Sequence, residues 1–318
     1  MSFINFNAIE NFSVNTIEIK VNFLGSGHYA YKTANAGKSY DGTKHIYEKD
    51  EIIASDHKWE VQFTFSGPTV LDIKEPTIKS VAAKGKKTLE DFLNIILKRK
   101  IPSKNISIHI NGHSRGAIIA KNVYDYLKSK FSSQIKFGKL ELADPYAGPL
   151  NRLRKSVDEF QSNGSVVIYS LKEQLYRSPS QVLNAEIIIF TNTSHDKTYF
   201  LLSYVNNHPE LKAGVYTMFD GGAYYRQCQK IKNCKTAVEE EKERKTLDQI
   251  IKAQLKQIVN EKDCETALNI FWKARITSRR SELFYERLAK ISPECKTKVL
   301  DDLQKRRKLI LKNKISKI

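Results

Sequence analysis

Apolar and polar residues alternate in several short stretches of the first two thirds of the chain, as they do in β-strands. The expected strands lie at 16–24, 59–65, 106–110, 137–143, 165–171 and 186–190. Apolar residues at helical spacing fall between them, at 88–97 and 117–127, while 32–58 is polar and loop-like. Thr88 and Asp91 indicate that the first of these helices begins with a capping box. Strands that alternate with helices predict an α/β fold, in which a mostly parallel sheet carries helices on both faces.

From about residue 236 the pattern changes, and only helical spacing remains. The charged helical stretches lie at 237–259, 264–275, 282–289 and 296–311. We therefore expect two parts, an α/β domain over residues 1–228 and a basic α-helical region over 229–318. The second part would serve the first as a lid, a brace or a membrane-contact module.

A sharp turn separates the strand at 106–110 from the helix that follows it. Residues 112–116 read Gly-His-Ser-Arg-Gly, a G-x-S-x-G pattern that is weak evidence when it stands alone. A strand before it and a helix after it are the context in which this pattern forms a nucleophile elbow, with the serine hydroxyl exposed above the sheet. Side chains at the two glycine positions would collide with the neighbouring strand and helix. The pattern therefore predicts Ser114 as a nucleophile.

A serine nucleophile needs a general base, and the base needs an acid to orient it. Two histidines follow Ser114 in the chain, His195 and His208. His195 comes just after the expected strand at 186–190, in a loop at the carboxyl edge of the sheet, whereas no expected strand precedes His208. We therefore expect His195 to be the base.

Three acidic residues could orient that base. Asp144 ends the expected strand that follows the elbow helix, which places its carboxylate at the same sheet edge, and it is the foremost candidate. Glu173 follows the next strand and is the topological alternative. Asp196 adjoins His195, which makes its imidazole awkward to reach. An aspartate before a proline is also common in turns, so Asp144 has a purely structural interpretation as well.

An acyl-transfer site also needs two backbone N–H groups that stabilise an oxyanion. The first should belong to Arg115, directly after the nucleophile. The second should come from the glycine-containing loop at 23–27, and we name Ser26 or an adjacent residue for it. The glycines would let the backbone of that loop approach a substrate, although they also fit an ordinary turn.

The sequence of the elbow, Gly-His-Ser-Arg-Gly-Ala at 112–117, resembles the G-[FH]-S-R-G-A elbow of a bacterial lipase-like branch of the α/β-hydrolases. That branch includes phospholipase effectors that are delivered into other cells. The Asp-Pro-Tyr-Ala-Gly-Pro loop at 144–149 is similar to its aspartate-proline loop, and 23–27 looks like its oxyanion loop. The resemblance covers roughly 17–200. It implies an α/β-hydrolase-like fold and ester hydrolysis, often of acyl lipids, without an obligatory metal or redox cofactor.

Charge distinguishes the end of the chain from the rest. The net charge is +18, and residues 230–318 carry 24 Lys and Arg against 13 Asp and Glu. The last segment, from Lys296 to Ile318, holds nine of these basic residues and has apolar residues between them. A basic amphipathic helix can lie on an anionic membrane surface, although it can also pack on its neighbours and expose a solvated face. No nucleic-acid-binding motif is present, so nucleic acid is not an expected partner.

Cysteine content and the beginning of the sequence give further expectations. The four cysteines are too few for a disulfide scaffold and are not spaced as in a zinc site, so we expect free thiols, with Cys228 and Cys234 able to bridge under oxidising conditions. No stretch has the apolar length of a membrane span, and the beginning lacks the pattern of a Sec signal peptide. We expect a bacterial cytoplasmic protein, or an effector secreted by a specialised system.

Taken together, these patterns predict a serine hydrolase that cleaves a carboxylic ester through a Ser-His-Asp triad, foremost a lipid or phospholipid acyl ester. No cofactor and no metal ligands are expected. A small-ester or thioester hydrolase is the alternative within enzymes. A catalytically inactive hydrolase fold that binds a membrane or a protein is the alternative outside them.

Overall fold

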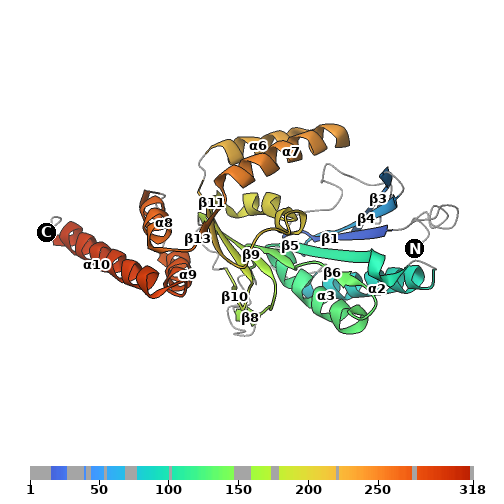
Figure 1. Cartoon of the computed structure of the whole chain (residues 1–318), viewed down its shortest axis with the longest axis horizontal. Coiled ribbons are helices and arrows are strands. Elements are labelled where there is room, and N and C mark those ends of the chain that lie inside the picture. The colour runs from blue at the N-terminus through green and yellow to red at the C-terminus, as the bar shows by residue number, and fades with distance from the viewer. Residues whose placement is uncertain are drawn as a thin grey trace.

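A central β-sheet runs through the protein, and helices lie on either side of it (Figure 1). The computed structural model describes residues 16–26, 39–40, 44–53, 56–68, 77–99, 102–146, 159–172, 179–219, 222–273 and 278–315. Within these ranges the strands are β1 (Thr16–Phe23), β2 (Ser39–Tyr40), β3 (Lys44–Ile53), β4 (Asp56–Phe65), β5 (Ile106–His113), β6 (Lys136–Phe137), β7 (Glu141–Ala143), β8 (Glu159–Gln161), β9 (Val166–Lys172), β10 (Gln181–Leu183), β11 (Ile187–Ser194), β12 (Gly214–Met218) and β13 (Lys256–Ile258).

The strands of the sheet follow the order β13-β12-β11-β9-β7-β5-β1-β4-β3-β2, with β6 beside β5. All neighbours from β12 to β4 are parallel, and the antiparallel pairs lie toward the two edges. From β1 the chain runs to the edge strand β2 and returns through β3 to β4, then crosses over β1 to β5 and continues toward the opposite edge. In open α/β sheets, sites form at the carboxyl ends of the strands where the direction of winding reverses. Here that point lies between β1 and β5.

Helices bury two hydrophobic cores, one on each face of the sheet. The helical elements of the described chain are η2 (Ser103–Asn105), α2 (Ile78–Leu97), α3 (Arg115–Phe131), η4 (His195–Leu201), α5 (Tyr204–Asn207), α6 (Ala223–Asn233), α7 (Ala237–Gln254), α8 (Glu261–Lys273), α9 (Ser278–Ala289) and α10 (Pro293–Ile315). Side chains of α2, α3, α8 and α9 belong to the first core, and those of η4, α5, α6 and α7 belong to the second. Figure 1 shows α2 and α3 on the side of the sheet opposite to α6 and α7.

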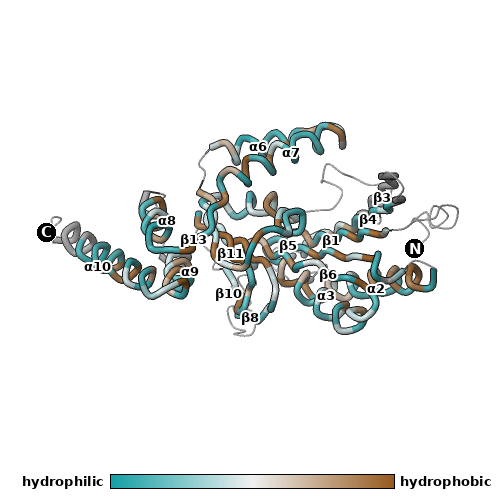
Figure 2. The backbone as a smooth tube through the Cα atoms, viewed as in Figure 1, coloured by the Kyte–Doolittle hydropathy of each residue, from teal (hydrophilic) through white to brown (hydrophobic). Residues whose placement is uncertain are grey.

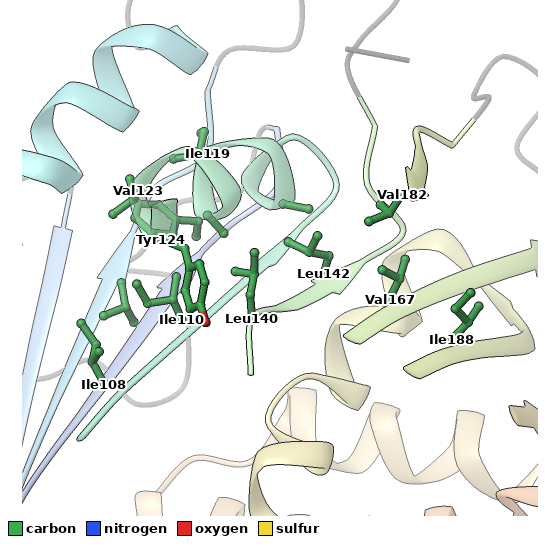
Figure 3. Close-up of a cluster of buried hydrophobic side chains, with 14 of the residues drawn as sticks. Ile108, Ile110, Ile119, Val123, Tyr124, Leu140, Leu142, Val167, Val182 and Ile188 are labelled. Carbon is green, nitrogen blue, oxygen red and sulfur yellow. The ribbon is translucent and has the colours of Figure 1, made fainter. Parts of the chain in front are cut away.

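The helix after β5 shows how the spacing of apolar residues creates the first core. Ile119 and Val123, four residues apart on α3, are fully buried beside Ile108 and Ile110 of β5 (Figure 3). Parallel strands are buried on both faces, which is why β9 and β11 begin with continuous apolar runs, at 166–169 and 187–190. The fold prediction is therefore confirmed as an α/β-hydrolase-like, mostly parallel sheet with helices on both faces and a helical C-terminal region.

Two expectations for the first hundred residues are wrong. Residues 32–58 do not form a loop throughout, because β3 pairs antiparallel with β4 along its whole length. Strand pairing depends on backbone hydrogen bonds, which a charged sequence such as that of β3 does not reveal. Helix α2 begins at Ile78 and not at Thr88, since Thr77 and Ser80 form the capping box. Serine takes the place that glutamate has in the common motif.

Strands also occur where the sequence indicates none. β12 and the three-residue β13 extend the sheet, and β13 pairs antiparallel with β12 after helix α7. The expected strand at 137–143 is divided into β6 and β7. β13 contributes a strand from beyond residue 229 to the sheet, so the helical region is joined to the α/β part by backbone hydrogen bonds. The boundary near residue 229 remains a prediction.

Figure 2 shows apolar strands in the centre and hydrophilic stretches along α7 and α10. Among the described residues, no helix combines the length and the apolar character that crossing a membrane requires. Helix α10 is instead basic, and its Val299 packs in the first core with residues of α8 and α9.

The expectation of four free thiols is wrong, because Cys264 of α8 and Cys295 of α10 form a disulfide with a Cα–Cα distance of 5.7 Å. The two residues are 31 positions apart, and sequence spacing alone does not reveal that their helices lie side by side. Both are fully buried, whereas Cys228 and Cys234 are free.

Replacing both bridged cysteines with serine should destabilise the C-terminal helices. Opening a loop of this length restores chain entropy to the unfolded state worth about 3.7 kcal/mol. Denaturant unfolding monitored by circular dichroism under non-oxidising and oxidising conditions measures the loss. Cys234→Ser is the control and should leave the midpoint unchanged. An unchanged midpoint in the double variant would contradict a stabilising bridge.

Candidate functional site

The carboxyl ends of four parallel strands bring the expected site residues to one edge of the sheet. Ser26 follows β1, Ser114 follows β5, Asp144 follows β7 and His195 follows β11. In the register of the sheet, His113 lies opposite Ala143, so Ser114 and Asp144 leave neighbouring strands at the same level. Residues up to 169 positions apart in sequence thus converge because parallel strands all end at the same edge.

Ser114 occupies a strained position between β5 and α3. Its φ is 58° and its ψ is −124°. Residues other than glycine seldom adopt this backbone conformation, which costs on the order of 1–3 kcal/mol. The backbone N–H of Ser114 donates to the Ala143 carbonyl at 2.9 Å, and its own carbonyl accepts from the Tyr146 N–H at 3.2 Å. These bonds to the chain around the end of β7 hold the turn in its strained shape.

Glycines allow three backbone segments to meet at this turn. A Cβ at Gly112 would overlap the backbone of Gly116, and a Cβ at Gly116 would overlap the Phe23 carbonyl at the end of β1. A Cβ at Gly25 would lie 3.0 Å from Ser114 Cβ and 2.9 Å from His113 Nδ1. The loop after β1 therefore lies directly against the predicted nucleophile.

Asp144 and His195 form the central interaction of the site. His195 Nδ1 donates to Asp144 Oδ2 at 2.5 Å, and the side chains are almost completely buried. The other carboxylate oxygen, Oδ1, accepts from the Ser170 N–H at 3.1 Å, and the Asp144 N–H donates to the Ile168 carbonyl. Both oxygens of the carboxylate are thereby held by hydrogen bonds. A histidine that donates through Nδ1 presents its Nε2 lone pair as a base.

His113 is a residue of the site that sequence reasoning missed. Its Nε2 donates to the His195 carbonyl at 2.8 Å, and the two imidazole rings lie with centroids 4.6 Å apart. Thr198 Oγ1 donates to the same carbonyl at 2.7 Å. These contacts fix the backbone of His195 from two sides. The signal in the sequence was present, since His113 precedes the nucleophile, but nothing in a motif of five residues assigns it a contact with residue 195.

The structure brings Asp144 and His195 together, but it does not join His195 to Ser114. Among the described residues, no hydrogen bond links Ser114 Oγ to the imidazole, and the exposed fraction of Ser114 is 5%. Without substrate, hydrogen bonds between nucleophile and base are often long and shorten only in the complex. The Ser26 hydroxyl is buried without a hydrogen-bond partner among the described residues.

The expected alternatives lie elsewhere or have other partners. Glu173 lies outside the described residues. Burial raises the pKa of Asp196, but the hydrogen bond from Ser194 and the Lys197 ammonium outweigh it and lower the pKa to about 2. Asp196 is therefore committed to that pairing. His208 contacts Glu210 at 3.0 Å and Asp248 at 3.4 Å.

Arg115 begins helix α3, so its backbone N–H lies at the positive end of the helix dipole. This is the position that the sequence predicts for one oxyanion donor. Within the described part of the chain, no group of three or more His, Cys, Asp or Glu side chains is arranged to hold a metal ion.

Comparison with known proteins gives little further information. No protein-family model and no curated protein matches the sequence. Among solved structures, the chain is similar to the structure of the Tle1 effector bound to the VgrG spike from the Type 6 secretion system, with 14% sequence identity and a TM-score of 0.26. The match covers 56% of this chain and 45% of that chain, so the chain spans less than half of that protein's length. A likeness at this score supports no statement about a shared activity.

Gly116→Ala should destabilise the protein by about 3 kcal/mol, because the added Cβ meets backbone that cannot move without displacing β1. Gly222→Ala is the matched control, since its Cβ meets the flexible end of the Arg226 side chain. Denaturant unfolding should separate the two variants clearly. Equal stabilities would show that the crossing of β1 and the elbow is less tight than described.

Proposed function

We propose that this protein is a serine hydrolase that cleaves a carboxylic ester through a covalent acyl-enzyme. The observation that supports this most strongly is the buried hydrogen bond between Asp144 and His195, formed at the sheet edge where Ser114 lies on a strained turn. A lone serine in a strand-turn-helix crossover would need neither the strain nor a histidine oriented by a buried carboxylate.

In the proposed reaction, His195 Nε2 takes the proton of the Ser114 hydroxyl as its oxygen attacks the ester carbonyl. Asp144 holds the imidazole by its Nδ1–H and stabilises the imidazolium. Backbone N–H groups of Arg115 and Ser26 stabilise the oxyanion of the tetrahedral intermediate. The intermediate collapses, the alcohol leaves with the proton from His195, and water then releases the acid from Ser114 by the same steps.

The foremost substrate class is a lipid or phospholipid acyl ester. This choice is supported by the resemblance of residues 112–117 to a lipase-like elbow. A small-ester or thioester hydrolase uses the same residues, and an inactive fold that acts as a binding module would retain the hydrogen bonds without turnover. Activity on long-chain and short-chain esters distinguishes these alternatives.

Ser114→Ala should abolish covalent labelling by a fluorophosphonate and reduce ester hydrolysis at least about 1000-fold, because no other group supplies the nucleophile. Ser129→Ala, at an exposed serine of the same helix, is the matched control and should label like the original protein. Labelling is measured by intact-protein mass spectrometry and hydrolysis with acetyl, palmitoyl and phosphatidyl esters. Absence of labelling in the unaltered, folded protein would contradict the enzyme proposal.

We also propose that helix α10 contacts an anionic membrane surface and brings the site to its lipid substrate. Cys295 and Val299 attach the first turns of α10 to α8 and α9, while Lys305, Arg307 and Lys308 are exposed further along the helix. Exposed cations of this kind each contribute about 1 kcal/mol near an anionic surface.

Changing Lys305, Arg307 and Lys308 to glutamine together should weaken binding to phosphatidylserine-containing vesicles on the order of 100-fold, since about 3 kcal/mol is lost. Vesicle co-sedimentation at low salt measures the effect. A triple glutamine variant of the exposed lysines of α7 is the control, at Lys242, Lys245 and Lys252. Equal binding of the unaltered protein to anionic and neutral vesicles would remove the membrane proposal.

A further inference from the structure

The carboxylate of Glu141, the first residue of β7, is completely buried three residues before Asp144. Its Oε1 accepts from the Asn206 N–H at 2.8 Å and from Asn206 Nδ2 at 2.9 Å. Its Oε2 accepts from the Ser203 N–H. A charged side chain in the interior of a parallel sheet is costly unless its oxygens are satisfied, and here three N–H groups satisfy them. The proposed reaction uses none of these contacts.

The carboxylates of Glu141 in β7 and of Asp144 directly after it hold the same short segment of chain. Asp144 binds His195 at the beginning of η4, and Glu141 binds Ser203 and Asn206 at the beginning of α5. Asn206 lies eleven positions after His195, so the segment is fixed near both of its ends by carboxylates at the start of β7 and directly after it. The remaining contacts of the segment with β9 and β11 are between packed side chains.

The backbone around Ser203 is strained and is held by several hydrogen bonds. Ser203 has a φ of 70°, in the left-handed region, and its strained turn lies between η4 and α5. The Asn206 side chain also accepts from the Lys139 N–H at 2.9 Å and donates to the Lys139 carbonyl at 2.8 Å. The Asn111 side chain of β5 donates to Ser203 Oγ at 3.1 Å. Glu141 connects these hydrogen bonds to β7, the strand that Asp144 follows.

We propose that Glu141 is a positioning residue of the site, which holds the segment 195–206 so that His195 stays aligned with Asp144 and Ser114. The role rests on the proposed function, because alignment of His195 has a purpose only where it acts as a base. It requires the carboxylate form, since both oxygens accept from N–H groups and a proton on either oxygen would face a donor.

Burial raises the pKa of Glu141 to about 7, against the opposing effect of the hydrogen bonds from Asn206 and Ser203. Of the charged or titratable groups on the neighbouring elements, Lys139 pairs with Glu186. His109 lies 3.8 Å from Glu18 and also interacts with the Asn206 side chain, and burial lowers the pKa of His109. Asp144 is bound to His195. The Glu141 carboxyl group therefore gains or loses its proton within the pH range in which hydrolysis would be measured.

A rise in pH should change the stability of the protein and the alignment of His195 in opposite directions. Because the pKa of Glu141 in the folded state lies above the unfolded value of about 4.5, the folded state binds the proton more readily, and this contribution to stability is lost as pH rises from about 4.5 to 7. Alignment of His195 follows the opposite course, since it improves as the carboxylate form replaces the acid. A residue with only a structural role would change stability alone.

The test compares Glu141→Gln with the original protein and with Glu186→Gln, a matched change at the half-exposed carboxylate that pairs with Lys139. The readouts are the downfield proton resonance of His195 Nδ1–H, kcat and KM on an acyl ester, and the melting temperature. In Glu141→Gln we expect the resonance to broaden or shift and to lose its change near pH 7. We expect kcat to fall about 10-fold with KM unchanged.

An unaltered resonance and kcat in a folded Glu141→Gln protein would overturn the proposal, as would an equal effect of Glu186→Gln. If Glu141→Gln does not fold, Asn206→Ala decides, because it removes one hydrogen bond to Glu141 and leaves the carboxylate with two donors. It should shift the resonance in the same direction by a smaller amount, and no shift would overturn the proposal. The resonance does not depend on turnover, so a protein without esterase activity would reject the proposed function and still report on Glu141.

Discussion

The site depends on the close crossing of the elbow with the end of β1. Gly112 and Gly116 let α3 start directly against the last residue of β1, and this contact forces Ser114 into a positive φ that its hydrogen bonds then maintain. A bulkier residue at either glycine would push the helix away from the sheet. The position of the serine is thus a consequence of backbone packing, and the buried apolar stripe of α3 provides the burial that offsets the strain.

Strand β7 organises the polar part of the site. It has three residues, begins with Glu141 and is followed directly by Asp144, and the two carboxylates bind the beginning of η4 and the segment Ser203–Asn206 at α5. Parallel strands that end at one edge make this possible, because a carboxylate, a histidine and a serine can approach there without being near in sequence. In a buried sheet each such group must be hydrogen bonded, and for Asp144 and Glu141 the bonds all come from the chain itself.

The sequence predicted the parts of the fold that depend on side-chain periodicity and on glycine spacing. The α/β class, the strands β1, β5, β9 and β11 and the elbow with its helix follow from these local signals. Contacts between distant segments left no such signal: β3 is paired through its backbone, Cys264 and Cys295 meet through helix packing, and Glu141 was indistinguishable from a surface glutamate. The pairing of Asp144 with His195 was predicted from strand ends, and their catalytic roles remain predictions.

In the proposed reaction, Ser114 carries the acyl group during turnover. The most direct test is to mix the protein with a slowly deacylating ester, quench the reaction with acid within the first turnover, and analyse the peptides by mass spectrometry. We predict an acyl adduct on the peptide that contains Ser114, in an amount that approaches one adduct per protein molecule. The amount should fall sharply in the Asp144→Asn variant. Hydrolysis without an adduct, or an adduct on another residue, would contradict it.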